Sequence, residues 1–182
     1  MRRSALLTAF LFVAVIGASP AAAQSASSER DATRSRLASI LAIAGARSDV
    51  NVAFQQSTKN PYNFVGKMTG LTNCDMLEVV WGVGTSGTVS LRAYCHYKGN
   101  YIKLGRARDP QGLMRRLLYF NDQNFLYWGA DGTGDVFTAY SFTLESGFPD
   151  DAIVIVNRSL RNTDGFVGQL RPMIDGSAAP AK

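Results

Sequence analysis

The chain has 182 residues, of which 46% are hydrophobic and 18% charged, and its formal net charge is +5 at pH 7. Lys and Arg are scattered among acidic residues rather than grouped with aromatic ones, which argues against a nucleic-acid partner. The length fits one domain with an adequate core once a leader is removed.

The N-terminus has the pattern of a secretory signal peptide. Arg2 and Arg3 precede an apolar run over residues 5–16, and Ala21-Ala22-Ala23 offers small residues for signal peptidase. The run is too short to span about 30 Å of hydrocarbon comfortably as an anchor. We therefore expect residues 1–23 to be removed, with membrane contact only during export and a periplasmic or secreted mature protein.

The rest of the chain is predicted to form one α+β domain over residues 31–172. Residues 24–30 are expected to be a flexible leader and residues 173–182 a disordered tail, because both are rich in small and polar residues. Apolar residues at three- and four-residue spacing predict a helix over residues 31–46. Short β-like pieces follow at residues 50–54 and 62–69.

The clearest pattern is a hairpin. Residues 76–83 and 89–97 each alternate apolar and polar side chains, on either side of a turn that contains Gly84 and Gly87. This alternation is typical of half-buried antiparallel strands. Matching the two apolar faces predicts the pairs Leu77–Ala93, Val79–Leu91 and Trp81–Val89.

The second half repeats the mixture of strands and helices. Residues 101–104 are predicted to extend the sheet, and Pro110 opens a helix over residues 111–120. An aromatic hairpin over residues 125–142 follows, with a glycine-containing turn, and we expect it to be a central pair of a sheet covered on one face. A final helix is predicted to begin near Pro149 and to end at Pro172.

Cys74 and Cys95 are the only cysteines. In an exported protein a disulfide at the base of the first hairpin is favoured, while two unbonded thiols, or a reactive thiol with His96 as its base, are the alternatives. If the strand is regular back to Asn73, Cys74 and Cys95 have opposite parity. A bond then requires Cys74 to lie in the loop before the strand, or beside a bulge.

No catalytic constellation accompanies these cysteines. A single histidine without clustered acids predicts neither a metal site nor a serine-type triad, and no cofactor motif is recognised. Asp131 and Asp135 flank a Gly-Thr-Gly turn that faintly resembles a calcium loop, but the terminal bidentate acid is missing. An ordinary β-turn is the favoured interpretation, and we expect the protein not to be an enzyme.

Aromatic residues on the strands are the remaining candidates for function. Some of them are predicted to lie on a sheet face or edge that takes a partner, since exposed aromatic patches mark binding surfaces. The alternative is that they fill the core beneath the helices. The partner-binding candidates are Tyr94, Tyr127, Trp128 and Tyr140.

The order of predicted elements, together with FNDQNFLYWGADGTGDVFTAYSFTLESGFPDDAIVIVNRSL at residues 120–160, resembles the YbjN-like family of bacterial sensory transduction regulators. The matching positions are Asn121, Asn124, Asp131-Gly132, Asp135, residues 144–147 and Asp150. The resemblance implies a fold similar to type III secretion chaperones, a twisted antiparallel sheet with helices packed on one face. It also implies a tendency to form homodimers, binding of extended polypeptide, and no enzyme activity.

These observations together predict an exported, non-enzymatic, chaperone-like or regulatory module. It would bind a polypeptide partner at its sheet edge or at a groove between helices and sheet. The alternative function is a periplasmic domain that binds a small ligand or lipid between the sheet and the helices.

Overall fold

The computed structural model describes residues 20–179, so most of the predicted signal peptide and the last three residues lie outside the described part of the chain. The elements in chain order are α1 (Pro20–Ala46), β1 (Gln55–Gln56), β2 (Asn63–Met68), β3 (Met76–Val83), β4 (Thr88–Tyr97), β5 (Asn100–Tyr101), η1 (Leu104–Arg106), α2 (Pro110–Gln123), β6 (Tyr127–Ala130), β7 (Val136–Thr143), α3 (Asp150–Gly168) and α4 (Arg171–Ile174).

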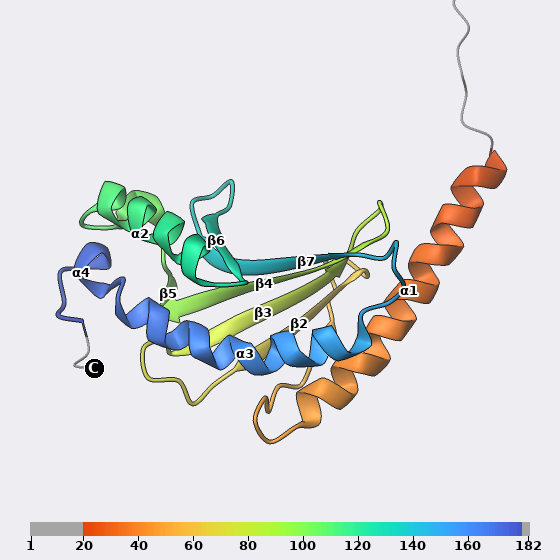
Figure 1. The fold of residues 1–182 in the computed structure, drawn as a ribbon, viewed down its shortest axis with the longest axis horizontal. Helices are drawn as coiled ribbons and strands as arrows, with labels where there is room; N and C mark the ends of the chain where they lie inside the picture. The colour runs from red at the N-terminus through yellow and green to blue at the C-terminus, as the bar shows by residue number, and fades with distance from the viewer. Residues whose placement is uncertain (1–19, 180–182) are drawn as a thin grey trace, which may run out of the picture.

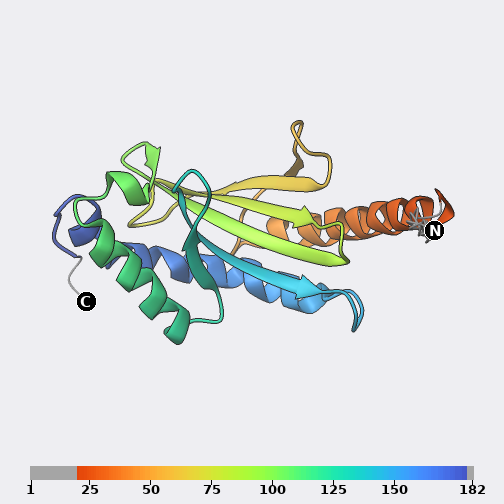
Figure 2. The same ribbon diagram turned by 90° about the horizontal axis from the view of Figure 1, so that it is seen from above.

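The strands form one antiparallel sheet in the order β1-β2-β3-β4-β7-β6, with β5 paired to β4. α1 and α3 pack on one face of the sheet, and α2 lies beside β6 at one end (Figure 1). Seen from above, after a 90° turn, the strands lie in front with α3 behind them (Figure 2). The prediction of an α+β fold, a twisted antiparallel sheet with its helices on one face, is confirmed. We call the helix-covered side the inner face and the opposite side the outer face.

Period-two alternation builds the core. In β3 and β4 the inner-face side chains are buried at every second residue, as the apolar pattern predicts. Trp81 is fully buried there, and its indole Nε1–H donates to Asn157 Oδ1 on α3 at 3.2 Å, so the deepest aromatic of the sheet is bonded to the covering helix. At the other end Phe120 of α2 packs on Trp128 and Phe166, with ring centroids 5.4 and 5.0 Å away.

The predicted pairing of β3 with β4 has the correct parity but is offset by two residues. Leu77 pairs with Cys95, Val79 with Ala93 and Trp81 with Leu91. The strands continue as far as Val83–Val89, and Gly84 N–H donates to Thr88 O at 2.8 Å to close a shorter loop. A two-residue shift leaves the same side chains inward, so the apolar pattern alone could not distinguish the two registers.

The aromatic hairpin is not central. β7 pairs with β4 inside the sheet, but β6 is the last strand on its side.

Residues 50–54 were predicted to be β-like, but they do not form a strand of the sheet. They run from α1 to β1 across the inner face. A Cβ added at Gly66 of β2 would clash with Val52 and Phe54, so the glycine leaves room for this crossing segment.

Both predicted flexible ends contain ordered elements. Residues 24–30 belong to α1, and Arg30 Nη2 donates to Val83 O at 2.8 Å while its guanidinium lies 3.5 Å from the centroid of the Tyr62 ring. At the other end residues 171–174 form α4, and Asp175 accepts from Lys98 Nζ at 2.5 Å and from the Tyr97 hydroxyl at 3.0 Å. Side-chain contacts with the sheet hold these segments, which local composition does not reveal.

None of the helices among residues 20–179 combines the length and the apolar character that crossing a bilayer requires.

Candidate functional site

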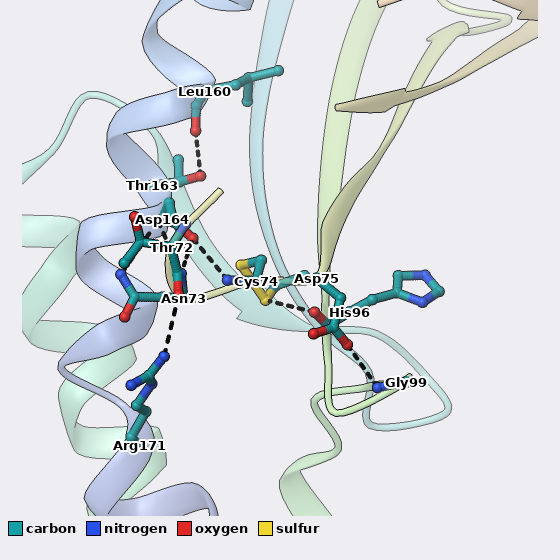
Figure 3. The surroundings of a disulfide bond; sticks show 11 residues. Thr72, Asn73, Cys74, Asp75, His96, Gly99, Leu160, Thr163, Asp164 and Arg171 are labelled. Atoms are coloured by element: carbon teal, nitrogen blue, oxygen red, sulfur yellow. Dashed lines mark hydrogen bonds between the residues drawn. A yellow bond between two sulfur atoms is a disulfide. The ribbon is translucent and has the colours of Figure 1, made fainter. Parts of the chain in front are cut away.

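Cys74 and Cys95 form a disulfide, with Cα atoms 5.6 Å apart (Figure 3). Cys74 lies in the loop before β3, which begins at Met76, and this placement removes the parity conflict that a regular strand would create. Asp75 N–H still donates to His96 O at 2.7 Å, so the backbone pairing continues past the strand end beside the bond. The predicted disulfide is confirmed, and neither cysteine has a thiol available for nucleophilic chemistry.

The loop that carries Cys74 is held by a carboxylate. Asp164 of α3 is only 7% exposed, and it accepts the backbone N–H groups of Thr72, Asn73 and Cys74 at 2.8–2.9 Å. Successive N–H groups turned to one side form a concavity that suits an anion, and here a side chain of the same protein occupies it (Figure 3). No sequence motif indicates a role for Asp164. Its position four residues after Leu160, on the buried stripe of α3, is the signal that could have indicated one.

His96 lies on the outer face, as a solvent-side strand residue should, but its side chain is only 16% exposed. Its ring centroid is 4.3 Å from that of Tyr101, and Nε2 is 3.8 Å from Glu78 Oε2. The Tyr101 hydroxyl donates to the same Glu78 oxygen at 3.1 Å. Burial, with the charge of Glu78 beside it, raises the pKa of Tyr101 to about 12.

The turn between β6 and β7 is closed by its own side chains. Asp131 Oδ1 accepts from the Thr133 N–H at 2.9 Å and from the Asp135 N–H at 3.1 Å, while Lys103 Nζ lies 2.7 Å from Asp135 Oδ1. The carboxylates are therefore engaged by donors and a cation of the protein. Among the described residues no group of three or more His, Cys, Asp or Glu side chains could hold a metal ion.

The four aromatic partner-binding candidates lie on two different faces. Tyr94 and Tyr127 are on the outer face, where Tyr94 is half-buried and Tyr127 is 42% exposed. Trp128 is on the inner face and only 6% exposed, so its indole fills the core between α2 and α3. Tyr140 is also on the inner face, half-buried, with its ring 4.7 Å from Phe142. Alternation separates Tyr127 from Trp128 because neighbouring strand residues point to opposite sides.

The outer face carries a continuous row of rings, which we call the outer-face row: Tyr101, Tyr94, Phe137 and Tyr127. Ring centroids are 5.8 Å apart for Tyr94 with Tyr101, 5.8 Å for Tyr94 with Phe137 and 6.3 Å for Tyr127 with Phe137. The exposed guanidinium of Arg92 lies 4.7 Å from the Phe137 ring. Phe137 and its contacts were missed from the sequence, because they depend on the pairing of β4 with β7.

The free edge of β6 is blocked at its second residue. The side chain of Asn121 on α2 accepts the Trp128 N–H at 2.5 Å and donates to Trp128 O at 3.2 Å, as a neighbouring strand would. Covering an edge in this way prevents pairing with another chain. β6 is therefore a poor place for a partner strand to add.

One small internal cavity lies between the sheet and the helices of the described residues. It is bounded by Leu77, Cys95, Trp128 and Val167 and has a volume of about 10 Å³, the least that one water requires. A much larger cleft, of about 860 Å³, lies on the surface between α2, the end of α3 and α4. Two arginines of α2, Arg115 and Arg116, line it together with Tyr119, Gln169 and Met173.

The described residues thus define an α+β protein whose sheet has one bare face, an inner face sealed by helices, and one disulfide at the base of its central hairpin. No protein family, no curated protein and no solved structure matches this chain.

Proposed function

We propose that this protein is an exported, non-enzymatic module that binds a polypeptide partner on the outer face of its sheet. The observation that carries the proposal is the outer-face row, with Arg92 beside it and no helix over it within residues 20–179 (Figure 2). Tyrosine and arginine, with tryptophan, are enriched among the residues that contribute most to protein–protein binding energy.

The composition of this surface favours a polypeptide over a lipid. Charged side chains lie among the rings, with Lys67 and Glu78 next to one another on β2 and β3 and Arg92 on β4. A hydrocarbon chain has no polar groups to pair with these charges, whereas a polypeptide offers amides and side chains of either sign. Because Asn121 blocks the edge at β6, the partner is expected to lie across the face instead of extending the sheet there.

Export is the second part of the proposal. The predicted signal peptide over residues 1–23 and the Cys74–Cys95 disulfide both suit the periplasm or the exterior, where disulfides persist. The resemblance to the YbjN-like family supports a regulatory or chaperone-like role, and a homodimer is a further expectation from it.

The test is capture of partners by residues 24–182 carrying an N-terminal tag, from a periplasmic extract of the source organism. Proteins identified by mass spectrometry with the wild type should be depleted about tenfold with Tyr127→Ser/Arg92→Ser. Ile155→Ser is the matched control, because Ile155 is 59% exposed on α3, on the other side of the sheet. Equal recovery by the double variant would reject the outer face, and recovery of no specific protein would reject the polypeptide-binding function.

A further inference from the structure

The surface cleft between α2 and α4 has the features of a ligand site, and it is separate from the outer face of the sheet. Its volume of about 860 Å³ lies within the range of small-molecule and peptide pockets. Its walls combine Arg115, Arg116 and Tyr119 of α2 with Pro172 and Met173 of α4. The cleft therefore offers positive charge and apolar surface side by side.

The charge in the cleft has no counter-ion among the described residues. Arg115 is exposed and forms no ion pair there, and Arg116 Nη2 donates to the neutral Gln169 Oε1 at 2.8 Å. No Asp or Glu of residues 20–179 lines the cleft, and Asp109, the N-cap of α2, accepts the Gly112 N–H at 2.8 Å. Two guanidinium groups without a carboxylate favour an anionic ligand group, above all one that accepts paired hydrogen bonds.

A buried acceptor at the wall of the cleft adds a second requirement. Asn73 is only 8% exposed, and its Nδ2 donates to Asp164 Oδ2 at 3.3 Å, which fixes the amide orientation. Its Oδ1 is buried, and no donor in the described part of the chain forms a hydrogen bond with it. In Figure 3 this amide extends away from the disulfide. Leaving a buried carbonyl oxygen without a donor is unfavourable, so the site favours a ligand that brings an N–H or O–H.

We propose that the cleft binds the free C-terminal carboxylate of a polypeptide. The carboxylate suits Arg115 and Arg116, the last backbone N–H suits Asn73 Oδ1, and an apolar terminal side chain suits Met173 and Pro172. Fatty-acid carboxylates supply the negative charge without the donor, and therefore fit the site less completely. This inference rests on the proposed function and specifies how the polypeptide partner is recognised.

The test is fluorescence anisotropy with residues 24–182. The tag is placed at the N-terminus because Ala179, close to the C-terminus, lines the cleft. The probe is an N-terminally labelled peptide pool, Gly-Ser-Gly-Ser-Xaa-Xaa-Leu, with Xaa varied. The free acid is expected to bind with a micromolar dissociation constant. The C-terminal amide, and the acid with an N-methylated terminal leucine, should each bind about tenfold more weakly. Arg115→Gln/Arg116→Gln should weaken binding of the free acid by a similar factor.

Arg34→Gln/Lys59→Gln is the control, because it removes the same charge from α1 and from the loop between β1 and β2. This variant should bind the free acid like the wild type. The proposal is overturned if the amide binds as well as the acid, or if the free acid shows no binding up to about 1 mM. Binding of dodecanoate that depends on the two arginines, without binding of the peptide pool, would also overturn it and assign the cleft to an anionic amphiphile.

The two proposals can fail separately. Partners lost from Tyr127→Ser/Arg92→Ser but retained by Arg115→Gln/Arg116→Gln would leave the outer face as the only binding surface. Binding of the free acid without any captured protein that depends on the outer face would leave only the cleft.

Discussion

The carboxylate of Asp164 on α3 binds the backbone of Cys74, whose N–H donates to Asp164 Oδ1 at 2.8 Å. The disulfide then continues the link from Cys74 to Cys95 on β4. Helix and central strand are thus connected by one hydrogen-bonded carboxylate and one covalent bond. The same carboxylate also orients Asn73, at the wall of the α2–α4 cleft.

Replacing Asp164 should destabilise the protein strongly. Asp164→Asn keeps the volume but presents an amide N–H₂ to backbone donors, so we expect the free energy of unfolding to fall by about 3 kcal/mol. Urea denaturation followed by tryptophan fluorescence measures it. Asp122→Asn is the same change at an exposed position of α2 and should stay within about 0.5 kcal/mol of the wild type. Equal effects of both variants would contradict the structural role of Asp164.

Reducing the disulfide should lower stability by a comparable amount. The bond joins residues 21 apart, and in the chain-entropy model a loop of this size contributes about 3 kcal/mol. We expect this loss in Cys74→Ser/Cys95→Ser, measured by urea denaturation. A reducing agent should destabilise the wild type and leave the double variant unchanged. If full reduction left the free energy of unfolding of the wild type unchanged, the bond would contribute nothing to stability.

The Tyr101 hydroxyl should ionise at a higher pH than an ordinary tyrosine, and this should make the stability of the protein fall at alkaline pH. Its pKa is raised to about 12 by burial first and by Glu78 next, so the folded state holds the phenol proton more tightly than the unfolded state does. The contribution of Tyr101 to the free energy of unfolding is therefore fully present below about pH 10, and it is lost as the pH rises from about 10 towards 12. Ultraviolet titration of phenolate should reveal one late tyrosine that Tyr101→Phe removes.

Glu78→Gln should move that late titration to lower pH, because it removes the negative charge that opposes phenolate formation. Glu145→Gln, at an exposed position, should leave it unchanged. A titration unaffected by Glu78→Gln would assign the shift to burial alone.

Opening the edge of β6 should cause association. Asn121→Ala removes both hydrogen bonds to the Trp128 backbone, so we expect about 1–2 kcal/mol of destabilisation and concentration-dependent oligomers in size-exclusion chromatography. Asn124→Ala is the matched control, since the Asn124 amide donates to the helical carbonyl of Phe120 and not to a strand. Oligomers formed equally by both variants would show that the β6 edge is not responsible.

The sequence predicted part of the candidate site. Tyr94 and Tyr127 do lie on the outer face, but Trp128 and Tyr140 do not, although all four are aromatic residues of strands. The division of the four residues between the two faces has a physical origin. Parity within one strand says which residues share a side, but the side that helices cover is set by packing across β4, β7 and α3. The cleft was missed for the same reason, because Arg116 and Asn73 meet there from distant parts of the chain.

By itself the sequence determined the local patterns: which strands alternate, that helices begin at Pro110 and just after Pro149, and which two cysteines could bond. These depend on neighbours a few residues apart, and period and composition encode them directly. Only the tertiary structure decided the two-residue offset between β3 and β4, the position of β6 at the edge, and the burial of Asp164 against the Cys74 loop. Each joins segments far apart in the chain, where several arrangements satisfy the same apolar pattern and the complete packing of the core selects one.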